Sequence, residues 1–373
     1  MDARAKLLET LELQRAGFEG QGTAACPFYK RLGDLFSADV ERGGPVWTVL
    51  EHYANEPFEE AYVLRLLGAV HRLALSGDGP RFAAHYPSTG GDGDAAATYE
   101  AIVALLADPP PLVADMFSRP PQTNEVGRSI ALATGLAVIA DTLQLPIALR
   151  EIGSSAGLNL RLDTYWYEQD GVGWGNPDSD VRFVDMWDGR FPPFGPGLTI
   201  ADRRGCDRDP IDATDPDGAL TLLCYVWPEQ ASRFATARAA ITQANGMPVT
   251  IDREGCDAWL PRQLADRTPG TAMVVMHSVM WQYLTDNDRA ACSKAIEDAG
   301  GGATPDTPIA WLRLEPHPET FFPGELRVRI WDGSSDRETL HANSGFHGGH
   351  LTTPTRSLLK NSCLGARDCA RGS

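Results

Sequence analysis

The spacing of apolar residues divides the chain into two parts. From the N-terminus to about Asp141, apolar residues recur at intervals of three and four, which predicts amphipathic helices. Glycine- and proline-rich breaks at 77–80, 88–94 and 108–111 interrupt this pattern, and no convincing alternation of single apolar and polar residues precedes residue 145. We therefore expect an all-helical cap domain over residues 1–144. Its predicted helices include 5–14, 45–53, 61–75 and 98–107.

After Pro146, apolar runs of strand length alternate with helical segments, a pattern typical of βαβ units and a parallel sheet. We expect this α/β domain over residues 145–350, with a long insertion at 168–198 and a disordered or non-native tail at 351–373. The predicted strands are 147–153, 201–212, 249–255, 271–279, 308–316 and 325–333, the last alternating as an antiparallel edge strand does. The predicted helices are 156–167, 219–244 with a bend at Pro228, 257–265 and 286–300.

Composition narrows the choice of partners. The chain has 373 residues and a formal net charge of −17, which argues against nucleic acids and anionic membranes and leaves a small molecule as the expected partner. No apolar run reaches the length of a membrane span, and the N-terminus carries no secretory signal. The seven cysteines show no metal-binding spacing, so we expect a cytoplasmic protein with reduced thiols and no metal. The oligomeric state stays open.

A glycine-rich turn between a predicted strand and a predicted helix carries the most information. Glycines at this place let the backbone approach a ligand, and the following N–H groups favour negative charge. Methyltransferases that use S-adenosylmethionine (SAM) build the turn as acidic-x-Gly-x-Gly-x-Gly, and here Ser155 replaces the middle glycine. The acidic residue contacts the methionine ammonium in those enzymes. The predicted cofactor-binding residues are Glu151, Gly153, Ser154, Ser155, Ala156, Gly157 and Asn159.

The ends of the later strands extend this hypothesis. Asp207 ends the second strand, where a carboxylate accepts hydrogen bonds from the ribose hydroxyls in such a fold. Glu254 or Asp257, after the third strand, is expected against the adenine amino group, and the choice between them is open. His277 ends the fourth strand, which faces the transferring methyl group, and is the candidate general base.

Gly153-Ser154-Ser155-Ala156-Gly157 also fits G-x-S-x-G, the nucleophile elbow of serine hydrolases. Ser155 would be the nucleophile, and His277 or His347 the base. Against this interpretation, the elbow belongs after several strands, whereas the preceding 145 residues are predicted to be helical. Glu151 and Asp207 would also have no function in it.

Two further segments have a structural and a functional interpretation. Residues 122–128 open a helix, where Thr123 or Asn124 suits the N-cap and Glu125 the first turn. The same helix start would alternatively bring Asn124, Glu125 and Arg128 into a cleft. We assign Glu125 and Arg128 candidate catalytic roles and Asn124 a substrate-binding role. Trp227 and Glu229 lie at the predicted bend and are substrate-binding candidates, although a tryptophan there is more often part of a core.

Several segments resemble a bacterial family of uncharacterised proteins, a domain of unknown function. The most specific are QTNE-x-GR at 122–128 and EIGSSAGLNL at 151–160. The resemblance implies a Rossmann-like fold similar to SAM-dependent methyltransferases, with a mostly parallel seven-stranded sheet and a helical N-terminal extension, and it brings no established reaction. Family members usually end in a basic, tryptophan-containing segment after a His-Gly pair, whereas His347-Gly348 here runs into an unlike tail.

From these observations we expect a SAM-dependent methyltransferase that acts on a small molecule. The alternatives are a serine hydrolase with Ser155 as nucleophile and a non-catalytic SAM-binding or structural protein. The sequence lacks an (Asp/Asn)-Pro-Pro-(Tyr/Phe) motif after the fourth strand, which argues against methylation of the amino nitrogen of bases or of protein glutamine.

Overall fold

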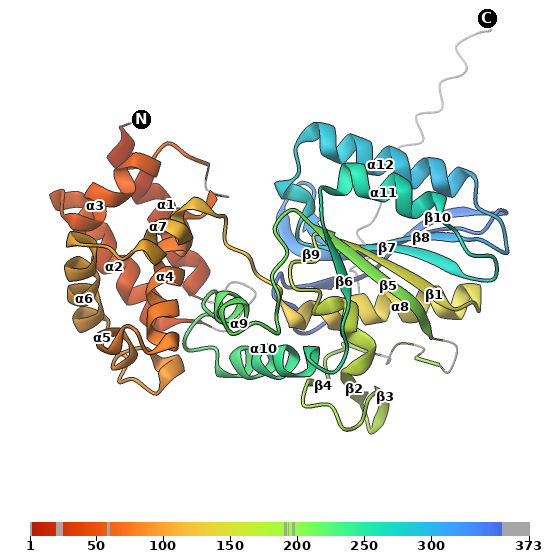
Figure 1. The fold of residues 1–373 in the computed structure, drawn as a ribbon, viewed down its shortest axis with the longest axis horizontal. Coiled ribbons are helices and arrows are strands. Elements are labelled where there is room, and N and C mark those ends of the chain that lie inside the picture. Colours follow the sequence, from red (N-terminus) through yellow and green to blue (C-terminus); the bar gives the residue numbers. More distant parts are fainter. Residues whose placement is uncertain are drawn as a thin grey trace, which may run out of the picture.

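The computed structural model describes residues 2–19, 25–57, 60–189, 192, 194–195 and 198–352; most of the predicted tail lies outside these residues. It forms a helical N-terminal lobe and an α/β lobe (Figure 1). Every described element before residue 144 is helical, as the apolar spacing predicts. The elements of the first lobe are α1 (Ala3–Phe18), α2 (Pro27–Arg42), α3 (Pro45–Leu50), η1 (Glu51–Tyr53), α4 (Tyr62–Ser76), α5 (Pro80–Ala83), η3 (Pro87–Thr89), α6 (Ala95–Ala107) and α7 (Pro111–Ser118).

Helix α4 lies at the centre of the helical lobe. Its residues from Val63 to Ala74 are nearly all buried, because the helix is apolar on most of its circumference. Leu66, Leu67 and Val70 share one core with apolar residues of α1, α2, α3, α6 and α7. The lobe therefore has a hydrophobic core of its own.

The α/β lobe is built on a seven-stranded sheet with the order β10-β9-β8-β7-β1-β5-β6. The five strands β6, β5, β1, β7 and β8 are parallel, whereas β9 is antiparallel to β8 and β10 to β9. This confirms a mixed α/β fold with a mostly parallel seven-stranded sheet. The strands are β1 (Ile147–Ile152), β5 (Ile200–Asp207), β6 (Thr250–Arg253), β7 (Ala272–Ser278), β8 (Ile309–His317), β9 (Phe321–Trp331) and β10 (Asp336–Ser344).

The edge of the sheet differs from the prediction. Strand β9 is antiparallel, as its alternation indicates, but it is an interior strand, and the edge is β10, which the sequence does not predict. The burial of β10 shows the reason, because its first three residues are exposed and only Ala342 and Ser344 are buried. A strand with so little apolar burial leaves little hydrophobic pattern to detect.

Helices cover both faces of the sheet (Figure 1). Helix α8 (Ser129–Leu143) packs on one face, where Leu149 and Leu312 join its core, and α11 (Cys256–Ala265) and α12 (Asp286–Gly301) pack on the other, with Ala148 and Val275. Helix α8 falls within the helical segment predicted for residues 1–144, yet it shares the core of the sheet. Within the described residues, 126–143 is long and apolar enough to span a membrane, but 67% of it is buried in this core.

The segment after β1 is not the single helix predicted at 156–167. It forms a short 3-10 helix, η5 (Asn159–Thr164), and then the small sheet β3-β2-β4, with β2 (Trp166–Gln169), β3 (Val172–Gly175) and β4 (Arg182–Val184). Side chains take the carbonyls that an α-helix would use: the Tyr165 hydroxyl donates to Leu158 O and the Tyr167 hydroxyl to Leu162 O. The predicted insertion 168–198 thus contains strands.

The predicted bend at Pro228 is a complete break between two helices, α9 (Pro216–Leu223) and α10 (Ala231–Ala244), since proline has no N–H to donate. The two helices connect the lobes. Arg72 of α4 donates to Asp217 O at 2.8 Å and to Thr221 Oγ1 at 2.6 Å, and His71 Nδ1 bonds Cys224 O at 2.9 Å. In Figure 1, α9 and α10 lie between the two lobes.

Candidate functional site

Strands β1 and β7 are parallel neighbours, and the strand order reverses between them. From β1 the chain continues to β5 on one side, and from β7 it continues to β8 on the other. Open α/β sheets bind ligands outside the carboxyl ends of their strands at such a switch point. Glu151 lies at the end of β1 and residues 153–159 follow the strand, so the turn that the sequence singles out lies at this switch point.

Glu151 is a buried carboxylate at the end of β1. It is 2% exposed, and its Oε2 atom has no hydrogen-bond partner among the described residues. Burial and the Asp207 carboxylate raise the pKa of Glu151 well above its usual value, and Arg128 and Arg161 oppose this rise only in part. Such an acceptor is costly to bury unless a ligand or water satisfies it.

The turn after Glu151 has a left-handed backbone at three alternate residues. Gly153, Ser155 and Gly157 have φ values of +66°, +52° and +65°. Ser155 therefore adopts the conformation that a middle glycine would adopt with less strain. Its Oγ atom is buried and has no partner among the described residues, and the same holds for Oδ1 of Asn159.

Hydrogen bonds from β5 hold this turn in place. The Ser154 hydroxyl donates to Cys206 O at 3.1 Å, and the Ser155 amide donates to Asp207 Oδ2 at 2.8 Å. The other oxygen of Asp207 accepts from the Asp209 amide at 2.9 Å. Asp207 thus organises the turn, and a ribose hydroxyl would share oxygens that already accept a bond each.

The two candidates for the adenine contact differ in their surroundings. Glu254 is ion-paired with Arg262, whose Nη1 atom donates a 3.0 Å hydrogen bond to Glu254 Oε1, and this pairing lowers the pKa of Glu254. Asp257 lies in the first turn of α11.

Residues 122–125 form hydrogen bonds with the glycine-rich turn and with the loop after β5. Asn124 Oδ1 accepts the Leu158 amide at 2.7 Å, and Glu125 O accepts Asn159 Nδ2 at 3.4 Å. Gln122 reaches the loop after β5, where it donates to Asp209 O at 2.8 Å. Asn124 therefore caps η5, so its amide oxygen already has a structural function rather than lining an open cleft.

Glu125 belongs to a partly buried ionic cluster that links three distant segments. Its Oε2 atom pairs with Arg233 of α10 and lies 3.3 Å from Nδ1 of His347. Burial alone would raise the pKa of Glu125, but Arg233 and His347 outweigh it and hold the pKa well below its usual value. Burial lowers the pKa of His347, which favours the neutral imidazole.

Arg128 ties the segment around His347 to the sheet. Its Nε atom donates to Phe346 O at 2.7 Å and its Nη1 atom to Ser278 O at 3.2 Å. Burial lowers the pKa of this guanidinium, which Glu125 and Glu315 partly oppose. Arg128 is thus engaged with main-chain carbonyls at the end of β7 and in the segment after β10, which is a positioning role rather than the catalytic role predicted for it.

His277 is a satisfied core histidine, and its prediction as the general base is wrong. Its Nε2 accepts the Trp311 indole N–H at 2.9 Å, so Nδ1 carries the proton and donates to Glu315 Oε1 at 2.6 Å. The ring is fully buried and stacks on Trp281 at 4.8 Å. Neither nitrogen is available to take a proton from a substrate. Both partners lie more than 30 residues away in sequence, so no local pattern reveals them.

Trp227 and Glu229 join the two lobes instead of facing a substrate. Trp227 packs edge-on against Phe18 at 5.0 Å and against His347 at 5.8 Å. Glu229 Oε2 accepts the Phe28 amide at 2.6 Å, which caps the N-terminal end of α2. The predicted substrate-binding role of Glu229 is therefore replaced by helix capping.

In the described part of the chain no histidine lies within hydrogen-bond distance of Ser155 Oγ, as the hydrolase interpretation would require. The left-handed Ser155 agrees with a strained elbow, but its Oγ has no hydrogen-bond partner there. Both nitrogens of His277 are occupied, and Nδ1 of His347 faces Glu125 and Arg233.

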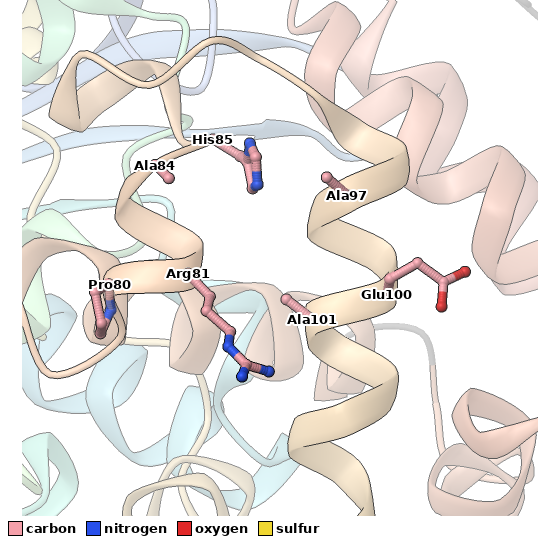
Figure 2. Close-up of a pocket in the computed structure, with 7 residues that line it drawn as sticks. All are labelled: Pro80, Arg81, Ala84, His85, Ala97, Glu100 and Ala101. Carbon is pink, nitrogen blue, oxygen red and sulfur yellow. The ribbon is translucent and has the colours of Figure 1, made fainter.

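A surface hollow lies elsewhere, between α5 and α6 of the helical lobe. Figure 2 shows Arg81, Ala84 and His85 on one side and Ala97 and Ala101 on the facing helix. His85 is already paired with Asp92 at 2.8 Å. The hollow is open and lined mainly by apolar atoms, and none of the residues of the glycine-rich turn borders it.

Residues 15–352 match the family described as "Uncharacterized protein conserved in bacteria (DUF2332)". The chain belongs to this family. No curated protein and no solved structure matches the chain. The match covers both lobes and includes Glu125, Glu151 and His347, so the residues of the candidate site lie within the family's own boundaries.

Proposed function

We propose that this member of the family binds SAM at the carboxyl end of β1 and transfers its methyl group to a small molecule. In chain order the parallel strands stand as third, second, first, fourth and fifth, the order of the dinucleotide-binding α/β fold. The observation that carries the proposal is Glu151, a buried carboxylate at the switch point whose Oε2 atom lacks a partner in the described residues.

The unpartnered atoms of the turn suit the amino-acid end of SAM. Glu151 Oε2 and Asn159 Oδ1 are acceptors, and Ser155 Oγ can accept as well as donate. A group that satisfies them must donate hydrogen bonds, and a cation satisfies a buried carboxylate best. A primary ammonium meets both requirements. When bound, SAM supplies an electrophilic methyl group on a sulfonium.

The remaining contacts follow from the strand ends. Asp207 is the residue proposed for the ribose, next to the turn that it holds. Of the two adenine candidates we favour Asp257, because the guanidinium of Arg262 already occupies the carboxylate of Glu254. In these assignments the residues at the strand ends bind and align the cofactor.

His347 replaces His277 as the proposed base. Its side chain is 28% exposed, so it can reach an acceptor, and Glu125 orients its ring. Burial lowers the pKa of His347, so the imidazole is neutral and able to take a proton near neutral pH.

Calorimetry with S-adenosylhomocysteine tests the binding step. We expect saturable binding to the wild-type chain, and Glu151→Gln should weaken it at least tenfold, about 1.4 kcal/mol. Glu100→Gln, on the exposed side of α6, is the matched control and should leave the affinity unchanged. No binding to the wild-type chain, or equal binding to Glu151→Gln, would contradict the proposal.

Two alternatives are distinguished by further measurements. Labelling of Ser155 by a fluorophosphonate probe in the folded protein would support a hydrolase instead. If the chain binds SAM and transfers no methyl group to any of a panel of small-molecule acceptors, a non-catalytic SAM-binding protein is favoured. Loss of turnover in His347→Asn, with cofactor affinity retained, would support the base assignment.

A further inference from the structure

Two thiols face each other on the sheet surface opposite α8. Cys256 is the first residue of α11, and Cys292 lies in α12, the helix packed beside it. The Cys292 thiol donates to Cys256 Sγ at 3.3 Å, and Cys206 of β5 belongs to the same apolar cluster. The functional proposal above uses neither thiol.

The position of Cys256 favours its thiolate. The N-terminal end of a helix carries partial positive charge, and a thiol in its first turn is more readily deprotonated. Donation from Cys292 lowers the pKa of Cys256 further, and Arg208 acts in the same direction, whereas burial, Asp257 and Asp288 oppose it. The pKa of Cys292 is raised, so of the two thiols Cys256 loses its proton more readily.

Cys256 is buried, but the residues that precede it in the chain are partly exposed to solvent. It directly follows Glu254 and Gly255, which are half-buried, and helix ends open at a small cost in free energy. Cys292 lies in the second turn of a sixteen-residue helix and is fully buried. A small oxidant therefore meets Cys256 first.

We propose that Cys256 and Cys292 are a redox modification site that forms a reversible disulfide when the protein meets hydrogen peroxide. The Cys256 thiolate attacks one peroxide oxygen, so that an S–O bond forms, the O–O bond breaks and, with the proton released by Cys256, one water leaves. The Cys292 sulfur then attacks the sulfenic sulfur, an S–S bond forms, and the hydroxyl departs with the Cys292 proton as a second water. Two thiols are oxidised to one disulfide, and one peroxide is reduced to two waters.

The disulfide would covalently join α11 to α12 at the end where Arg208 already pairs with Asp288 at 2.9 Å. Because Asp257 follows Cys256 directly, the bond would also restrain the first turn of α11. The proposal stands on the two thiols and does not depend on SAM binding.

Peptide mass spectrometry on the folded chain tests whether the disulfide between Cys256 and Cys292 forms. Cys363 and Cys369 are first changed to Ser, so that the remaining cysteines are those of residues 1–352. After peroxide treatment, alkylation of free thiols and digestion, we expect the Cys256 and Cys292 peptides to be linked, two hydrogen atoms lighter than the free pair. Dithiothreitol should separate them.

Matched variants distinguish the roles of Cys256 and Cys292. Cys292→Ser should abolish the link and leave Cys256 as a sulfenic acid that dimedone traps. Cys224→Ser, which changes a buried cysteine at the end of α9, should leave the link intact. Circular dichroism confirms that each variant is folded. Free thiols at both positions after treatment, a link between Cys256 and Cys206, or a link that forms only in urea would each overturn the proposal.

Discussion

The backbone amide of Ser155 donates a 2.8 Å hydrogen bond to Oδ2 of Asp207, which joins the turn after β1 to the end of β5. The bond holds a non-glycine residue at φ +52°, although this conformation costs an L-residue about 1 kcal/mol or more. This strained residue lies next to Glu151, whose Oε2 atom has no partner in the described residues, and both features cost stability.

Replacing Ser155 by Gly should therefore stabilise the chain. The change removes the left-handed strain and a buried hydroxyl without a partner in the described residues, and the greater freedom of glycine in the unfolded chain offsets part of the gain. We expect urea denaturation to show about 1 kcal/mol of added stability. Ser155→Ala, which removes only the hydroxyl, should gain less. An equal or larger gain for Ala would show that backbone strain is not the cause.

Glu151→Gln should stabilise the chain most at high pH. Because the pKa of Glu151 is raised in the folded state, the protonated form is favoured there, and its stabilising effect is lost as the pH rises from the ordinary value through the raised one. Removing the ionisable group removes this loss. Denaturation at about pH 5 and about pH 8 should show the variant's advantage growing with pH, to about 1 kcal/mol or more. A constant difference between the two pH values would contradict the raised pKa.

Glu125→Gln should have the opposite effect. The lowered pKa of Glu125 means that its pairing with Arg233 and His347 stabilises the fold above the ordinary carboxylate pKa and is lost as the pH falls through the lowered value. At neutral pH we expect a loss of about 2 kcal/mol, since Arg233 is left partly buried without its carboxylate.

A double-mutant cycle checks the coupling between these two residues. Arg233→Gln alone should also destabilise the chain, and the double variant should lose less than the sum of the two single changes. Additive losses would mean that Glu125 and Arg233 do not stabilise each other. The difference between Glu125→Gln and the wild-type chain should shrink as the pH falls below the ordinary carboxylate pKa, about 4.

Gly127→Ala should displace the segment that carries His347. A Cβ atom at this position would lie 2.4 Å from His347 O, which is main chain and cannot move alone. Hydrogen exchange at 346–351 should therefore accelerate, and His347 should separate from Glu125. Gly17→Ala is the control, because a Cβ there meets nothing within 4 Å, and alanine in α1 should add up to about 1 kcal/mol. Unchanged exchange in Gly127→Ala would show that the contact is not needed.

Local pattern was enough to predict the five parallel strands of the sheet and to single out the turn after β1, because buried parallel strands such as β1 and β7 are continuous apolar runs and a glycine turn has a fixed spacing. It could not show which core α8 joins, since a helix that is apolar nearly all round fits either lobe. It also could not separate a free histidine from a satisfied one. His277 differs from His347 only through partners distant in sequence, such as Trp311.

The paired residues Glu125 and His347 are far apart in the sequence. Glu125 lies at the beginning of the α/β lobe, and His347 is among the last residues that the structure describes. Between them the ribosome makes more than two hundred residues, including all seven strands of the main sheet. The helical lobe, with its separate core, can fold early during synthesis, but the ionic cluster around Glu125 cannot exist before translation is nearly complete. A truncated product that ends before His347 would thus carry a folded helical lobe and an unfinished site.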